Sequence, residues 1–238
     1  MTIALVFADV TSSLDEKQRE QIAKLTADAI DDMPVGAEVT LYPIHMAMQR
    51  PKPILDPFTV PAIRPMQRRA WKLYKEKRRN QIRENIANLY REVNASPTID
   101  KRTCILDAIV FAGNYFKSRK EPGDRILVIA SDMLEECNNT PLQSAIRLNK
   151  AVISQEIKAA ARFPASLGLS KVRIVLLLPS DNPGKQPYPR PRDEFLIEFW
   201  NTIFAKATGN PQISPDWYVG RLPDWLKHLS SQSTGGVD

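Results

Sequence analysis

The stretch from Ile3 to Ser13, IALVFADVTSS, decides the fold class of this chain. Residues 3–8 form a short, entirely apolar run, which Asp9 ends. A strand without polar positions is typical of a parallel sheet that helices cover on both faces, because neither face of such a sheet meets solvent. Thr11 and Ser13 follow directly. We therefore expect a buried strand in an α/β fold, with polar side chains at its carboxyl end.

The rest of the chain alternates apolar runs with segments of helical spacing. Further strands are expected at 37–44, 125–130 and 172–178, and helices at 14–33, 104–116, 141–163 and 193–208. Ser12 or Ser13 can cap the first helix. Two proline-rich stretches, 50–65 and 179–191, are expected to be extended straps. The alternation predicts a doubly wound, mainly parallel sheet with helices on both faces.

Length and composition are those of a folded globular protein. With 238 residues, 43% hydrophobic and 25% charged, the chain is not a disordered, collagen-like or coiled-coil protein. We expect one domain over 1–229, with an insertion at 50–95, and a flexible tail at 230–238.

The apolar runs and the cysteines bear on location. No apolar run approaches the roughly 20 residues that cross a bilayer, and the first is too short for a secretory signal, so we expect a cytoplasmic protein. Cys104 adjoins Thr103 and Cys137 lies just past Asp132, so both are expected on one rim of the sheet, where they could be linked, but reduced thiols are the ordinary case in that compartment.

The basic residues are concentrated in one segment. The net charge is +6, yet residues 64–91 alone carry ten basic and two acidic residues, a local +8. Their spacing predicts a helix whose apolar stripe includes Trp71, Tyr74 and Ile82. Eight cations on it form a candidate surface for nucleic acid or an acidic partner: Arg68, Arg69, Lys72, Lys75, Lys77, Arg78, Arg79 and Arg83.

Side chains with oxygen atoms lie at the ends of two expected strands and at the start of one expected helix. Asp9, Thr11 and Ser13 follow the first strand, Thr103 precedes an apolar helix, and Asp132 ends another strand. Ligands of open α/β sheets bind at the carboxyl ends of strands, and hard oxygen donors suit Mg²⁺, Mn²⁺ or Ca²⁺. The alternative is that these residues are only helix caps and turn formers.

The order Asp9-x-Thr11-x-Ser13, then Thr103, then Asp132 resembles the metal-ion-dependent adhesion site of the von Willebrand factor A family. Thr11 replaces the usual serine but keeps the hydroxyl. The resemblance implies Thr11 and Ser13 as direct ligands, Thr103 as a switchable ligand, and Asp9 and Asp132 acting through water. It leaves one coordination position for an acidic residue of a partner.

Three function hypotheses follow from these features. The first is a non-enzymatic, divalent-cation-dependent protein-interaction module, and the resemblance implies a subunit of an intracellular assembly. The second is a nucleic-acid-binding protein that acts through residues 64–91. A metal-dependent hydrolase would use the same oxygens but lacks an obvious general base. A phosphatase of the haloacid dehalogenase type would need an acid where Thr11 stands.

Overall fold

The structure is a computed structural model that describes residues 1–45, 51–62, 68–97, 101–119, 122–137, 167–180, 191–212 and 215–219. The expected helix at 141–163, the tail at 230–238 and most of the second proline-rich strap lie outside these residues. The strands are β1 (Ile3–Asp9), β2 (Glu38–Ile44), β3 (Leu55–Thr59), β4 (Arg125–Ala130), β5 (Val172–Leu178) and β6 (Asp216–Val219). The helices are α1 (Glu16–Asp31), α2 (Arg68–Ala95), α3 (Ile105–Ser118) and α6 (Pro191–Thr208).

The six strands form one sheet in the order β3-β2-β1-β4-β5-β6. Only β3 is antiparallel to its neighbour, so the expected α/β fold with a mainly parallel sheet is confirmed. The strand order reverses between β1 and β4, and ligands of such sheets bind outside the carboxyl ends at that point. Asp9 ends β1 and Ser131 follows β4.

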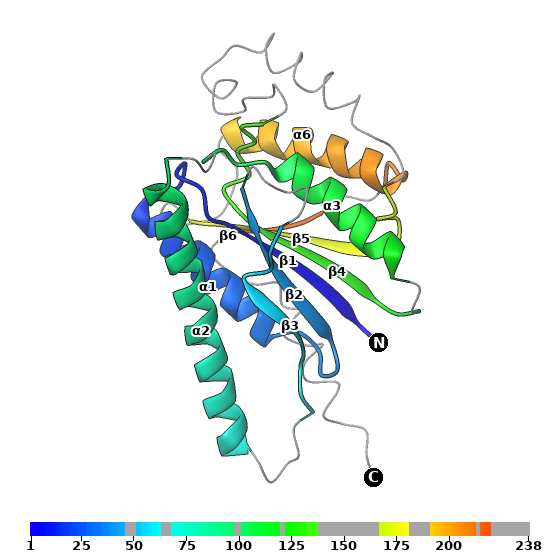
Figure 1. Cartoon of the computed structure of the whole chain (residues 1–238). Helices are drawn as coiled ribbons and strands as arrows, with labels where there is room; N and C mark the ends of the chain where they lie inside the picture. The colour runs from blue at the N-terminus through cyan, green and yellow to red at the C-terminus, as the bar shows by residue number, and fades with distance from the viewer. Residues whose placement is uncertain are drawn as a thin grey trace.

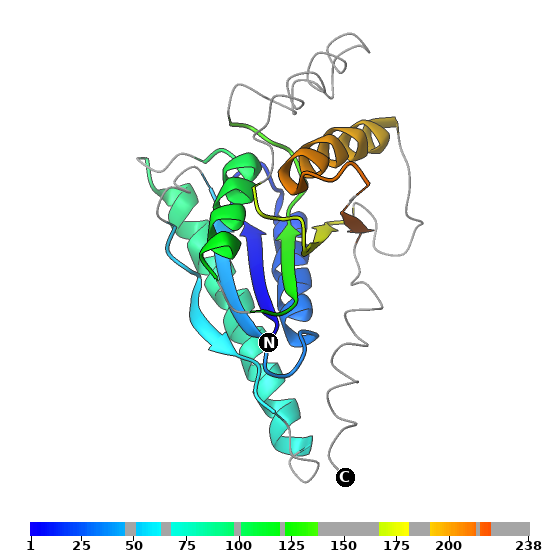
Figure 2. The ribbon, with the colours of Figure 1, turned by 90° about the vertical axis from the view of Figure 1, so that its right-hand side faces the viewer.

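Helices cover both faces of the sheet, as Figures 1 and 2 show. Side chains alternate along β1: Leu5 and Phe7 pack with α3 and α6, while Ala4 and Val6 pack with α1 and α2. This double burial explains why β1 contains no polar residue before Asp9.

Two local expectations about the chain need correction. The cap of α1 is Asp15, not Ser12 or Ser13: its carboxylate accepts from the Gln18 backbone N–H at 2.8 Å, and the Gln18 side chain accepts from the Asp15 N–H. This capping box satisfies two donors with one pair of residues. Part of the first proline-rich strap is the edge strand β3, where Pro57 is tolerated because one edge of the strand needs no ladder partner.

The expectation of two reduced cysteines is wrong, because Cys104 and Cys137 form a disulfide. The residue before α3 and the loop after β4 lie side by side at one rim, with the two Cα atoms 5.1 Å apart, within the ordinary range for a bridge. Disulfides persist mainly in oxidising compartments, so the cytoplasmic location stays a prediction. No helix among the described residues is long and apolar enough to span a membrane.

Candidate functional site

Three hydroxyl groups from distant parts of the chain meet at the carboxyl end of β1. The Thr11 Oγ1 lies 2.9 Å from the Ser13 Oγ and 2.6 Å from the Thr103 Oγ1, and the Ser13 Oγ lies 3.1 Å from the Thr103 Oγ1. Thr11 and Thr103 are buried and Ser13 is half-buried. Thr103 is 92 residues from Thr11, so the fold creates this hydroxyl triangle of Thr11, Ser13 and Thr103.

The Asp9 carboxylate is hydrogen-bonded to Thr11 of the hydroxyl triangle and to Ser131. Its Oδ1 accepts from the Thr11 hydroxyl at 2.7 Å and from the Thr11 backbone N–H at 3.0 Å, and its Oδ2 accepts from the Ser131 hydroxyl at 2.7 Å. Burial, the largest influence, raises the pKa of Asp9 above its usual value; the charge of Glu136 adds to this rise and the hydrogen bonds oppose it. A cation bound beside Asp9 would favour the charged form of this carboxylate.

The hydroxyls of the triangle are not helix caps. The cap of α1 is Asp15, and Cys104 stands at the cap position of α3 without a side-chain cap bond. The alternative that explained Thr11, Ser13 and Thr103 as caps therefore fails. These side chains contact one another and Asp9 instead.

Asp132 lies on the loop after β4, directly after Ser131, whose hydroxyl donates to Asp9. Its Oδ1 accepts from the Leu134 backbone N–H at 3.1 Å, which closes a turn of the kind aspartate favours. The next residue, Met133, has φ 61°, uncommon for a residue with a side chain. Its N–H donates to the Ser131 Oγ, and its carbonyl oxygen accepts from the Trp200 indole at 3.0 Å. These bonds fix the backbone next to Asp132.

Two glutamates on the same loop bind the backbone around Thr103. The Glu136 Oε2 accepts from the Thr103 N–H at 2.9 Å, and the Glu136 N–H donates to the Thr103 carbonyl at 2.9 Å. Glu135, fully buried, accepts from the Leu106 and Cys137 N–H groups at 2.9 and 3.0 Å. Burial, the largest influence, raises the pKa of Glu135 to about 7.

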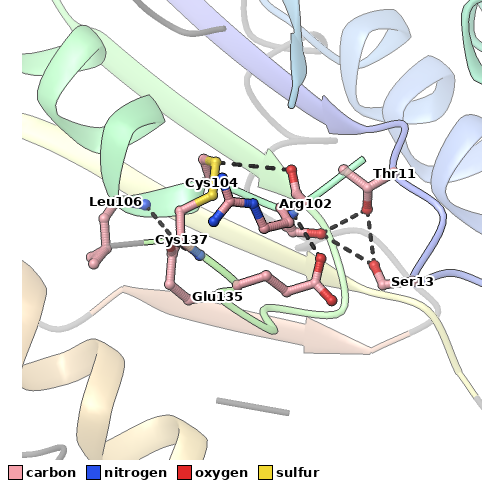
Figure 3. Close-up of a disulfide and its surroundings, with 9 residues drawn as sticks. Thr11, Ser13, Arg102, Cys104, Leu106, Glu135 and Cys137 are labelled. Atoms are coloured by element: carbon pink, nitrogen blue, oxygen red, sulfur yellow. Dashed lines mark hydrogen bonds between the residues drawn. A yellow bond between two sulfur atoms is a disulfide. The ribbon is translucent and has the colours of Figure 1, made fainter. Parts of the chain in front are cut away.

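Figure 3 shows the disulfide in the same region as Thr11 and Ser13. The loop after β4 is thus attached to the start of α3 by a covalent bond and by the carboxylates of Glu135 and Glu136. Sequence reasoning gave these glutamates no role, although the acidic pair closely follows Asp132. It placed Ser131 at the end of a strand but did not predict its bond to Asp9.

The separations within the hydroxyl triangle are those of hydrogen bonds, and they are also close to the spacing of neighbouring oxygens around Mg²⁺. An octahedral ion with oxygens at about 2.1 Å sets neighbouring ligands about 3.0 Å apart, and the three separations here are 2.6, 2.9 and 3.1 Å. Ca²⁺ takes six to eight oxygens in a flexible geometry and therefore imposes no single spacing. No group of three His, Cys, Asp or Glu side chains suited to a metal occurs in the described ranges, so any centre here depends on hydroxyls.

The basic residues of α2 do not form one surface. Arg79 pairs with Asp28 at 3.2 Å and with Asp31 at 2.7 Å, and Lys75 donates to the Asp31 carbonyl. Arg83 lies 4.0 Å from Asp28. Arg79 therefore neutralises acids of α1, and all three cations help to attach α2 to that helix.

The other cations of α2 differ in exposure. The Arg78 guanidinium stacks on Phe58 at 4.1 Å from the ring centre, whereas Arg69, Lys72 and Lys77 are exposed. The Arg68 side chain is outside the described set. Trp71 and Tyr74 of the predicted apolar stripe are half-buried, and their rings stack with the ring centres 5.3 Å apart. Only part of the predicted basic surface faces solvent.

Comparison with known proteins gives a structural likeness only. No family model and no curated protein matches the chain. A von Willebrand factor type A protein from Catenulispora acidiphila is similar with a TM-score of 0.48 and 10% identity, over 98% of this chain and 42% of that one. The pilus adhesin SpaC from Lactobacillus rhamnosus GG, in an open conformation, gives a TM-score of 0.43 and 10% identity, over 98% of this chain and 29% of that one. A second structure of SpaC gives 0.41 and 9%, over 98% and 30%. The chain spans less than half of each protein, and likenesses this low do not establish a family.

Proposed function

We propose that this protein is a non-enzymatic, divalent-cation-dependent protein-interaction module that binds an acidic residue of a partner, as a subunit of a larger assembly. The observation that carries the proposal is the hydroxyl triangle of Thr11, Ser13 and Thr103, which rests on the buried carboxylate of Asp9. The resemblance of these residues and Asp132 to a metal-ion-dependent adhesion site supports the same function.

The roles of the side chains follow from their hydrogen bonds. Thr11 donates its hydroxyl proton to Asp9, which leaves its oxygen lone pairs available to a metal. Ser13 and Thr103 would offer the other two oxygens, and Asp9 and Asp132 would supply negative charge. A bound Mg²⁺ or Mn²⁺ supplies a positive centre with a coordination position that a carboxylate can fill.

Thermal unfolding in EDTA and then in Mg²⁺ tests the metal centre. A ligand of the folded state raises the unfolding midpoint, with about 2.7 kcal/mol of added stability at a hundred times Kd. We expect this rise in the wild type and its loss in Thr103→Val, which removes one oxygen and little volume. Thr40→Val is the matched control, because Thr40 is buried with its hydroxyl bonded to Tyr115, away from the triangle.

The unfolding midpoints decide whether the metal centre exists. No rise in the wild type, or an equal rise in Thr103→Val, refutes the metal centre. Carboxylate recognition is then tested by NMR with acetate and acetamide. Acetate should shift the resonances of Thr11 and Ser13 only when Mg²⁺ is present, and acetamide should not shift them. Equal shifts with and without Mg²⁺ would exclude the proposed recognition.

A further inference from the structure

A cavity of about 590 Å³ lies between α1 and α2, which run side by side in Figure 1, and it reaches Asp9. Its apolar lining includes the buried Ala23 and Ile86, with the half-buried Tyr90 ring. The volume lies within the range of roughly 300 to 1,000 Å³ typical of ligand pockets. The cavity can therefore hold a large side chain together with a polar group.

Two arginines of the cavity wall have donors that bind nothing within the described ranges. The Arg19 guanidinium lies 3.8 Å from the centre of the Tyr90 ring, and its only hydrogen bond to a described residue runs from Nε to the Asp15 carbonyl at 3.0 Å. Arg83 makes only the 4.0 Å contact with Asp28, and its buried Nε has no hydrogen-bond partner among the described residues. Since a guanidinium carries five N–H groups, both can bind an anion.

The charge of the lining limits what that anion can be. Three carboxylates and four cations line the cavity, and these are Asp9, Glu16, Glu20, Arg19, Lys24, Arg83 and Arg91. Asp28, next to this lining, lies 3.1 Å from Lys24 and 4.0 Å from Arg83, so the local charge balance is close to zero. A single carboxylate adds one negative charge and disturbs this balance least. A phosphate group, with a charge of about −1.5 to −2, adds more negative charge and would be repelled by the glutamates on α1.

We propose that this cavity binds an acidic peptide segment of a protein partner. A carboxylate of the segment lies between Arg19 and Arg83, and a neighbouring large apolar side chain packs on Ala23, Ile86 and Tyr90. This inference rests on the proposed function in one respect, that the partner is a protein. Because Asp9 both lines the cavity and contacts Thr11, one partner segment can reach the cavity and the hydroxyl triangle together.

The test uses the full chain in EDTA, so that its result does not depend on the metal centre. The probe is the acetylated, amidated peptide Ala-Phe-Ala-Asp-Ala, titrated to about 10 mM while backbone NMR shifts are followed. Replacing Asp by Asn, or Phe by Ala, in the peptide should weaken binding about tenfold in each case. Inorganic phosphate and adenosine monophosphate are titrated in parallel.

Protein variants locate the site. Arg83→Gln should weaken binding about tenfold, and Ala87→Trp, which fills the cavity from its exposed wall, should abolish it. The control is Lys72→Gln, which removes an exposed cation of the same helix without touching the cavity. Near-native circular dichroism of each variant is required.

Each result decides the proposal. Saturable binding that needs both the Asp and the Phe of the peptide and is lost in the cavity variants supports it. Absence of peptide binding, binding unchanged by Arg83→Gln and Ala87→Trp, or tighter binding of phosphate overturns it. Repeating the titration in Mg²⁺ tests the metal-dependent function separately, because the increase in affinity should disappear in Thr103→Val while binding in EDTA remains.

Discussion

Reducing the disulfide between Cys104 and Cys137 should cost the protein about 4 kcal/mol of stability. The bridge joins residues 33 positions apart. In the chain-entropy model, closing a loop of this length removes about 12.5 cal/mol/K from the unfolded ensemble, or about 3.7 kcal/mol at 25 °C. Both cysteines are buried, and the hydrogen bonds between Thr103 and Glu136 hold the same two segments together in the folded state. The loss should therefore come mainly from the unfolded chain.

Urea unfolding with and without a dithiol reductant measures this loss through tryptophan fluorescence. The reduced protein should unfold at lower urea with a larger m-value, because its unfolded chain exposes more surface. Its folded-state NMR spectrum should change only near the two cysteines. The double variant Cys104→Ala and Cys137→Ala controls for the reductant, to which it should not respond.

Two results would refute this reasoning. A loss below about 1 kcal/mol on confirmed reduction would mean that loop closure does not determine the contribution of the bridge. Two titratable thiols in the protein unfolded without reductant would mean that the bond does not form at all.

Three further changes test buried polar groups by urea unfolding. Thr26→Val should raise the unfolding free energy by about 1 kcal/mol, because the buried Thr26 hydroxyl has no hydrogen-bond partner among the described residues; a loss of similar size would reveal an unseen partner. Glu135 has a pKa of about 7 in the folded state against 4.5 ordinarily, so the folded state binds the extra proton and stability falls as pH rises between these values. Glu135→Gln should therefore gain on the order of 3 kcal/mol relative to the wild type across that window, and a constant difference would contradict the assignment. Arg79→Ala should cost about 2 kcal/mol at neutral pH, because it leaves Asp31 buried without its 2.7 Å partner. This cost should shrink as acid protonates Asp31, whereas a cost independent of pH would point to lost packing alone.

Local patterns in the sequence were sufficient for most elements of the fold. The strands at 125–130 and 172–178 match β4 and β5, because both are apolar runs buried on two faces. The cap of α1 was misplaced by two or three residues, since several neighbouring residues can cap equally well and only the path of the chain selects among them. The edge strand β3 was missed within a proline-rich segment, because its pairing with β2 is not a local property.

The candidate site was predictable in its members more than in its contacts. Asp9, Thr11 and Ser13 follow a buried strand, so their common position at the sheet edge follows from the sequence. Ser131 is different, because its bond to Asp9 spans 122 residues and has no signature in either segment.

The sequence by itself determined the α/β class and the end of the sheet at which polar side chains gather, because burial on two faces makes the central strands β1 and β4 apolar and a polar residue, Asp9 or Ser131, ends each of these two runs. Only the tertiary structure decided three other features: the hydroxyl contact of Thr11 with Thr103, the neutralisation of α2 cations by acids of α1, and the bridge between Cys104 and Cys137. Each depends on the distance between segments far apart in the chain, and spacing along the sequence does not encode that distance.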